Sequence, residues 1–438
     1  MKHIAKLLVL ILIGLAARPL PAATDWPAFR GPWGDGHVSA PGDTKPTGLP
    51  LHWSDTNNVK WMIETPHRGW STPAIMDGQV WLTTATTNGT DYFVLCVDAE
   101  TGKVRLNEKV FHSDNPESLY NAYGVNFYAT PSAALEPGRV YVHFGTYGTA
   151  CLDAKTFQVL WKRIDMLCRH YRGPSSSPVI FEDLLILTFD GVDAQYLIAL
   201  DKKTGRTVWK THRSVEWNDI DETSSQMIRD GDRRKAHSTP LVVNVKSQPQ
   251  LLSAGAKAVY AYDPRTGREL WRIQHPAWSA APIPLYDDKL GLAFFINGSG
   301  KTELLAVRVD GQGDVTDTHI VWRTDQAVAK TASPILADGL FYMVSDEGLV
   351  SCREAATGAQ VWRGGIGGKY ASSPILADGR LYFCNQQGKT TILKAGRTFE
   401  VVATNTITGS FMASPAVSGK ALYLRTKTHL ARIEDSIR

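Results

Sequence analysis

Basic and aromatic residues recur a few positions before a series of prolines, in segments where the chain could bind another molecule. Ten of them are the candidate binding residues: Arg68, Trp70, Tyr128, Arg172, His237, Trp278, Lys330, Lys369, Tyr370 and Phe411. Guanidinium and ammonium groups bind anionic groups, and flat aromatic rings serve as apolar anchors. This combination predicts a binding surface for an acidic or extended partner. The alternative is that the aromatic rings pack in the interior and the charged groups are simply solvated.

The cysteines do not indicate metal or redox chemistry. The chain has 5 cysteines, with no adjacent pair and no Cys-x-x-Cys spacing, so a zinc site is not expected. Cys96, Cys151 and Cys352 each stand two residues before the acidic position of a repeat, where Ala199 and Ala261 stand in other copies. That position therefore calls for a small buried residue, which a free cysteine satisfies.

Other segments that resemble functional motifs are better explained as ordinary structure. Residues 310–314 (DGQGD) lack the acidic pattern and terminal Glu of a calcium loop, so a plain turn is expected. Residues 298–302 (GSGKT) lack the upstream glycine of a phosphate loop. His143 lies in an apolar stretch and is expected to pack in the core. We predict neither catalytic nor metal-binding residues.

The elements that must position the binding residues follow from an internal repeat. A small residue and a proline head an apolar strand eight times, at Pro73, Pro131, Pro178, Pro240, Pro282, Pro334, Pro374 and Pro415. The shortest spacing, from Pro334 to Pro374, is 40 residues. That is about the length of one four-stranded propeller blade.

Each copy has the same internal order of strands and turns. The first two strands are often joined by Asp-Gly, and the third leads into Asp-x-x-Thr-Gly and then Trp, as in residues 201–209 and 263–271. Glycine permits the positive φ of such a turn. The tryptophan, for example Trp209 or Trp271, falls on the fourth strand and is placed to pack on the next blade.

The two ends of the repeat predict how the ring closes. Residues 58–61 (NVKW) look like a fourth strand that precedes the first proline, and only three strands follow Pro415. The N-terminal strand should therefore complete the last blade, which removes open sheet edges. We predict an all-β protein with one eight-bladed β-propeller at residues 57–438 and an irregular arm at 24–56. Two separate β domains are the alternative.

The N-terminus and the charge indicate an exported protein. Residues 1–23 contain Lys2, an apolar run at 7–17 and small residues before Thr24, as in a cleavable signal peptide; an uncleaved anchor is the alternative. The first cysteine is Cys96, so a lipoprotein is not expected. No later segment is apolar enough to span a membrane, which predicts a periplasmic or extracellular location. A net charge of +4 is too small to indicate nucleic-acid binding.

The repeat Ala-x-Asp-x-x-Thr-Gly-x-x-x-Trp resembles the pyrroloquinoline-quinone-type propeller repeat. This repeat occurs in quinoprotein alcohol dehydrogenases and in outer-membrane assembly lipoproteins of the BamB type. Residues 25–32 (DWPAFRGP), 34–36 (GDG) and 313–316 (GDVT) are similar to a subfamily of exported propellers. The resemblance covers nearly the whole chain after residue 23, and it is more specific for fold than for function.

The resemblance implies two different functions. The dehydrogenases use a vicinal cysteine pair, calcium ligands that include Glu and Asn, and an Asp base, and this sequence has no matching set. We therefore expect no cofactor and a non-catalytic, BamB-like scaffold that binds a protein or peptide in the cell envelope. The alternatives are a quinone- and calcium-dependent dehydrogenase and a module that binds an acidic glycan. The polar insert at residues 214–234 is a candidate contact loop.

Overall fold

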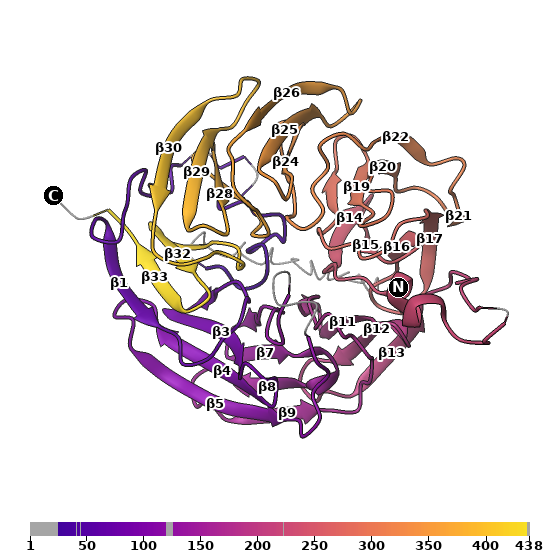
Figure 1. Ribbon diagram of the computed structural model, residues 1–438, viewed down its shortest axis with the longest axis horizontal. Helices are drawn as coiled ribbons and strands as arrows, with labels where there is room; N and C mark the ends of the chain where they lie inside the picture. Colours follow the sequence, from indigo (N-terminus) through magenta and orange to yellow (C-terminus); the bar gives the residue numbers. More distant parts are fainter. Residues whose placement is uncertain (1–24, 41, 44, 120–125, 222, 436–438) are drawn as a thin grey trace, which may run out of the picture.

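Eight small β-sheets stand around a central axis and form a ring (Figure 1). The computed structural model describes residues 25–40, 42, 43, 45–119, 126–221 and 223–435. Within these ranges the helical segments are two short 3-10 helices, η1 (Gly145–Tyr147) and η2 (Ile228–Arg234). None of the helices in these ranges has the length and apolar character needed to cross a membrane. The predicted all-β, eight-bladed propeller is confirmed.

The first four blades follow one another along the chain, with the innermost strand first. Blade 1 comprises β2 (Ala74–Met76), β3 (Gln79–Ala85), β4 (Asp91–Asp98) and β5 (Val104–His112). Blade 2 comprises β6 (Ala134–Glu136), β7 (Arg139–His143), β8 (Thr149–Asp153) and β9 (Val159–Arg163). Blade 3 comprises β10 (Val179–Phe181), β11 (Leu184–Asp190), β12 (Gln195–Asp201) and β13 (Thr207–His212). Blade 4 comprises β14 (Leu241–Val245), β15 (Gln248–Ala254), β16 (Ala258–Tyr262), β17 (Glu269–Gln274) and the added β21 (Gly313–Asp314).

The other four blades complete the ring. Blade 5 comprises β18 (Leu285–Asp287), β19 (Leu292–Ile296), β20 (Leu304–Arg308) and β22 (Ile320–Thr324). Blade 6 comprises β23 (Ile335–Ala337), β24 (Leu340–Val344), β25 (Leu349–Glu354) and β26 (Gln360–Gly365). Blade 7 comprises β27 (Ile375–Ala377), β28 (Arg380–Cys384), β29 (Lys389–Lys394) and β30 (Val401–Thr406). Blade 8 comprises β31 (Ala416–Ser418), β32 (Ala421–Arg425), β33 (His429–Ile433) and β1 (Val59–Glu64).

The ring closes as the sequence predicts. Strand β1 pairs antiparallel with β33, with Val59 opposite Ile433 and Glu64 opposite His429. The outer strand of blade 8 therefore comes from the N-terminal part of the chain and its other three strands come from the C-terminal part. Strands β31 and β2 also contact each other, so blade 8 packs against blade 1 and closes the ring within the described residues.

Tryptophan and glycine of the repeat join neighbouring blades. The indole N–H of Trp161 donates to the carbonyl of Lys202 in the next blade at 3.1 Å, and that of Trp209 donates to Pro264 at 3.1 Å. Gly267 has a φ of +72°, and a Cβ atom there would lie 2.5 Å from the Trp209 ring. The turn thus requires glycine both for its backbone conformation and for the approach of the ring.

Trp271 makes a different contact. The connection between β20 and β22 of blade 5 contains β21, which pairs with the strand that carries Trp271. Gly313 and Asp314 pair in parallel with Trp271 and Arg272, so this segment is more than the plain turn that we expected. The connection is long enough to reach back across the blade interface. The indole N–H of Trp271 donates to Oε1 of Gln250 in its own blade at 3.1 Å, and the side chain is fully buried.

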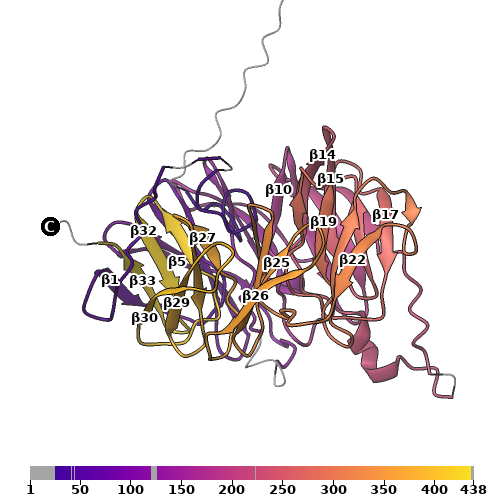
Figure 2. The ribbon, with the colours of Figure 1, turned by 90° about the horizontal axis from the view of Figure 1, so that it is seen from above.

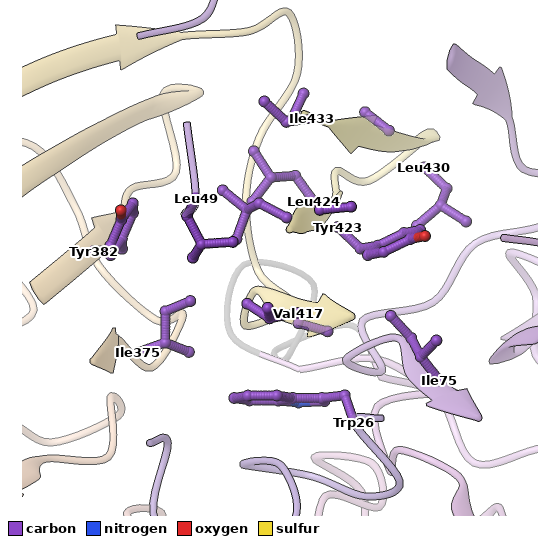
Figure 3. Close-up of a cluster of buried hydrophobic side chains, with 14 of the residues drawn as sticks. Trp26, Leu49, Ile75, Ile375, Tyr382, Val417, Tyr423, Leu424, Leu430 and Ile433 are labelled. Carbon is purple, nitrogen blue, oxygen red and sulfur yellow. The ribbon is translucent and has the colours of Figure 1, made fainter. Parts of the chain in front are cut away.

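The arm packs across the face of the ring that carries the turns between first and second strands, which we call the arm face. Trp26 exchanges two backbone hydrogen bonds with Ile75, both 2.8 Å long. Figure 3 shows the Trp26 ring in one apolar cluster with Ile75, Ile375 and Val417, and Leu49 from farther along the arm joins the same cluster. The predicted signal peptide lies outside the described residues.

Arg30 fixes the arm to the inner strands. Its side chain is 1% exposed. The guanidinium donates to the carbonyl oxygens of Pro334 and Asp35, at 2.9 and 2.8 Å, and to that of Pro374. Burial lowers the pKa of this guanidinium to about 10. Two of the repeat prolines thus offer carbonyl groups to a single arm residue.

Candidate functional site

The predicted binding residues belong to the face opposite the arm, which we call the rim face. It carries the connections from each fourth strand to the next first strand, and those between second and third strands. In Figure 2 the arm, in indigo, crosses one face, and the segment around η2, in pink, projects from the other. That segment belongs to the predicted contact loop at residues 214–234.

A cavity of about 360 Å³ lies where the eight blades meet, and we call it the channel cavity. Five of the ten predicted residues line it: Trp70, Arg172, His237, Trp278 and Lys330. Phe29 of the arm also contributes to its wall. The sequence repeat therefore brings residues from several blades to one place.

Hydroxyl groups next to the repeat prolines link successive blades around this cavity. The backbone N–H of Ser177 donates to Oγ1 of Thr239 at 2.9 Å. Ser333 donates in the same way to Ser373 at 2.9 Å, and Ser373 to Ser414 at 3.0 Å. Sequence reasoning identified the small residue before each proline but missed this role. Each hydroxyl satisfies a buried backbone donor of the preceding blade.

Three of the predicted aromatic residues are buried and offer no surface to a partner. Tyr128, Tyr370 and Phe411 are 2%, 1% and 1% exposed and belong to apolar clusters between blades. Trp70 is 7% exposed, and its ring packs at 5.9 Å from that of Phe127 while it also lines the channel cavity. These rings therefore pack in the interior, which is the alternative that the sequence left open.

The charged residues of the rim are more accessible. Arg68 and Lys369 are exposed and lie outside the lining of the channel cavity, and Lys330 is exposed at its edge. Within the described ranges, none of the side chains of Arg68, Arg233, Lys330 and Lys369 forms an ion pair. The Arg233 guanidinium lies 5.2 Å from the centroid of the Trp278 ring, close enough for a cation–π contact.

Other charged residues of the channel cavity form hydrogen bonds and ion pairs within the protein. Lys235 is buried, and its ammonium group donates to the carbonyl of Asp232 at 2.9 Å and also pairs with the Asp232 carboxylate. The Tyr171 hydroxyl donates to the same carboxylate. Burial lowers the pKa of Lys235, and Asp232 opposes that shift. These groups hold the connection between blades 3 and 4 in place.

Sequence reasoning missed Asp346, which also lines the channel cavity. Its carboxylate accepts the backbone N–H groups of Lys330 and Thr331, both at 3.3 Å. Burial raises its pKa. The residue lies between the second and third strands of blade 6, and not in a segment that precedes a repeat proline.

His143 is buried in the core, as predicted. Its Nδ1 atom lies 2.8 Å from Oγ1 of Thr149, and burial lowers the pKa of the imidazole to about 3. The folded protein therefore keeps this side chain neutral at a pH where an exposed histidine is charged.

We expect this histidine to make the protein less stable in mild acid. Below pH of about 6.5 the unfolded chain binds a proton that the folded chain excludes until about pH 3, so stability falls as the pH falls through this window. The loss expected from His143 alone is about 1.4 kcal/mol per pH unit, or about 2 kcal/mol at pH 5. Burial also lowers the pKa values of His170, His237 and His275, so these residues add to the loss of the wild type. Urea denaturation of the wild type and of a His143 variant at pH 7.5 and 5.0 gives the contribution of His143 as the difference between the two losses. His143→Gln should show a smaller pH-dependent loss than the wild type, whereas replacement of exposed His52 by Gln should leave the loss unchanged.

The cysteines occupy packing positions. All five are buried and unpaired, and burial raises their thiol pKa values, that of Cys384 to about 12. Among the residues that the structure describes, there is no group of three or more His, Cys, Asp or Glu side chains that could hold a metal ion.

The sequence of this propeller matches the model of one known protein family. The model of the family described as outer membrane protein assembly factor BamB matches residues 193–436, more than half of the chain. The chain belongs to the BamB family. No curated protein matches the sequence of this BamB-family chain.

Solved structures share the fold of this BamB-family protein at low sequence identity. The quinohemoprotein alcohol dehydrogenase of Comamonas testosteroni is 13% identical, with a TM-score of 0.67 over 95% of this chain and 81% of that one. BamB of Moraxella catarrhalis is 14% identical, with a TM-score of 0.56 over 86% and 99%. A europium-containing methanol dehydrogenase is 12% identical, with a TM-score of 0.64 over 92% and 89%. These likenesses show a shared propeller fold.

Proposed function

We propose that this protein is an exported, non-catalytic propeller that binds an acidic segment of another protein in the cell envelope through its rim face. The observation that carries the proposal is the set of cations at that face that form no ion pair in the described part of the chain: Arg68, Lys330 and Lys369 are exposed, and the half-buried Arg233 lies against the half-buried ring of Trp278. Cations of this kind attract a negatively charged segment, and Trp278 provides a flat surface against which it can pack. Membership of the BamB family supports a scaffold role.

The residues of the channel cavity do not fit the quinone and calcium pair of the resembled dehydrogenases. Its two carboxylates are already engaged, Asp232 by Lys235 and Tyr171 and Asp346 by two backbone N–H groups. A calcium ion needs six to eight oxygen ligands, and the other polar groups in the lining are mainly hydroxyls and cations. No adjacent cysteine pair is available to stack against a quinone.

Charge reversal at the rim tests the proposal. The mature protein is incubated with solubilised envelope from its source and crosslinked, and captured proteins are identified. We expect Lys330→Glu with Lys369→Glu to reduce capture of an acidic partner at least tenfold at low salt, because attraction becomes repulsion. Trp278→Ala should reduce it further.

The matched control places the same charge change on the arm face. Lys289 and Lys420 are exposed in turns between first and second strands, and replacement of both by Glu should leave capture unchanged. Equal capture by the rim variant and the wild type would refute the rim as the binding face. Capture that is lost equally in both double variants would show a response to net charge alone.

A further inference from the structure

The arm face carries an apolar groove that the arm itself leaves open. A cavity of about 250 Å³ is lined there by arm residues within 27–34 and by the first strands of blades 2, 3 and 4. Among the described residues of its lining, Thr239 alone carries a hydroxyl or charged side chain. An open depression over the first strands of blades 4 and 5 shares Trp33, Leu241 and Val242 with this cavity. We call the two together the arm-face groove.

The arm shows how an extended chain binds to the first strands of the blades. Its backbone pairs with Ile75, Leu135 and Leu376, the middle residues of β2, β6 and β27, through hydrogen bonds of 2.7–3.0 Å. Trp26 and Ile75, for example, exchange two such bonds. The inner edge of a blade therefore accepts a further segment in the way that the edge of a sheet accepts an added strand.

The arm does not occupy the inner edges of blades 3 and 4. Strand β10 pairs with β11 in the register in which β2 pairs with β3. Residues of an antiparallel pair alternate between bonding to the partner strand and pointing away from it. Ile180 in β10, like Ile75 in β2, therefore directs its N–H and C=O groups away from the blade, and so do Val242 and Asn244 in β14. Within the described ranges, none of the backbone groups of the arm bonds to β10 or β14.

The exposure of the apolar side chains follows the same division. Ile75 and Leu135, on strands that the arm covers, are 0% and 5% exposed. Ile180 and Val242 are half-buried, and so is Trp33 beside them. An added strand at this place would bury these three side chains and pair the unused backbone groups at the same time.

We propose that the arm-face groove binds an extended apolar segment of another protein, which pairs with β14 as the arm pairs with β2. The groove continues the interface between the arm and blades 1 and 2, and arm residues within 27–34 form one of its walls. Strand β14 is the centre because Leu241 and Val242 line both parts of the groove. A paired segment directs alternate side chains into the groove, whose lining favours apolar ones. This site lies on the face opposite the rim and goes beyond the proposed function.

Fluorescence anisotropy with synthetic peptides tests the site. Four fluorescein-labelled octapeptides alternate Thr with Val, Ile, Leu or Phe and are followed by two lysines for solubility. We expect the wild type to bind at least one of them. Two N-methylated versions of the bound peptide, methylated on odd or on even residues, each remove the N–H groups of one edge. One version should lose at least tenfold in affinity and the other should keep it, because a paired strand uses one edge only.

A protein variant and its matched control locate the site. Val242→Glu places a charge at the inner edge of β14 and should weaken peptide binding at least tenfold. Val321→Glu makes the same change on β22, where the side chain is 47% exposed, and should leave binding unchanged, as should the double rim variant. Circular dichroism checks the folding of each variant.

Three results would overturn the proposal directly. They are failure of the wild type to bind any of the four peptides, equal affinity of the two N-methylated versions, and unchanged affinity in Val242→Glu. Two other occupants would also overturn it. Sedimentation velocity would show a second copy in the groove as self-association that Val242→Glu abolishes. Peptide binding by a chain that begins at Thr24, but not by the full chain, would show that residues 1–23 fill the groove.

Discussion

Replacing Trp271 with alanine is expected to lower the free energy of unfolding by about 3–5 kcal/mol. The side chain is fully buried, and its ring meets Phe295 of blade 5 edge-on at 6.1 Å. Truncation removes apolar contacts between two blades and opens a cavity that the rigid sheets cannot close. It also leaves Oε1 of Gln250 without its indole donor. Chemical denaturation followed by circular dichroism measures the change.

A substitution on the outside of the neighbouring blade serves as the control. Val321 lies in β22 and is 47% exposed, so Val321→Ala should change stability by less than about 0.5 kcal/mol. Trp271→Phe keeps most of the apolar volume and should fall between the two. A loss below 1 kcal/mol for Trp271→Ala would contradict the packing described above.

Removal of Asp190 is expected to be equally damaging, for an electrostatic reason. Arg213 and Asp190 form a buried two-pronged ion pair, with nitrogen–oxygen distances of 2.6 and 3.0 Å. The guanidinium also donates to Oγ of Ser253 at 2.9 Å and lies 4.8 Å from the centroid of the Tyr260 ring. Asp190→Ala leaves a buried cation without its counter-ion, for which we expect a loss of about 3–5 kcal/mol.

A double-mutant cycle separates the ion pair from simple loss of volume. Arg213→Met removes the cation, Asp190→Leu removes the anion, and the double variant removes both charges while it keeps apolar bulk. We expect the double variant to be more stable than Asp190→Leu alone, since no charge remains buried and unpaired. Stability losses that simply add would contradict this explanation.

The fold could be predicted from the sequence because the same short motif recurs in successive blades, and its residues act over short distances along the chain. The proline that heads each inner strand, the glycine of the turn and Trp209 on the outer strand all act within one blade or on the next. Closure was predictable for the same reason, since one strand was surplus before the first proline and one was missing after the last. The pairing of Gly313 with Trp271 was missed because nothing in the repeat indicates it.

The site was only partly predictable. Sequence offsets placed Tyr128 and Trp278 in equivalent segments, but the packing of adjacent blades decides that the first is buried and the second reaches the cavity. Asp346 comes from a different type of connection.

The pairing of β1 with β33 also determines the order in which the ring can be built during synthesis. Blades 1 to 7 can each form once their own strands have emerged, because every strand they need is close in sequence. Blade 8 cannot, since its outer strand is made before all the others and its three partners are made last. Strand β1 must therefore remain unpaired until residues 416–433 arrive. Pairing between such distant segments forms slowly, and until then the incomplete ring exposes the faces most prone to aggregation.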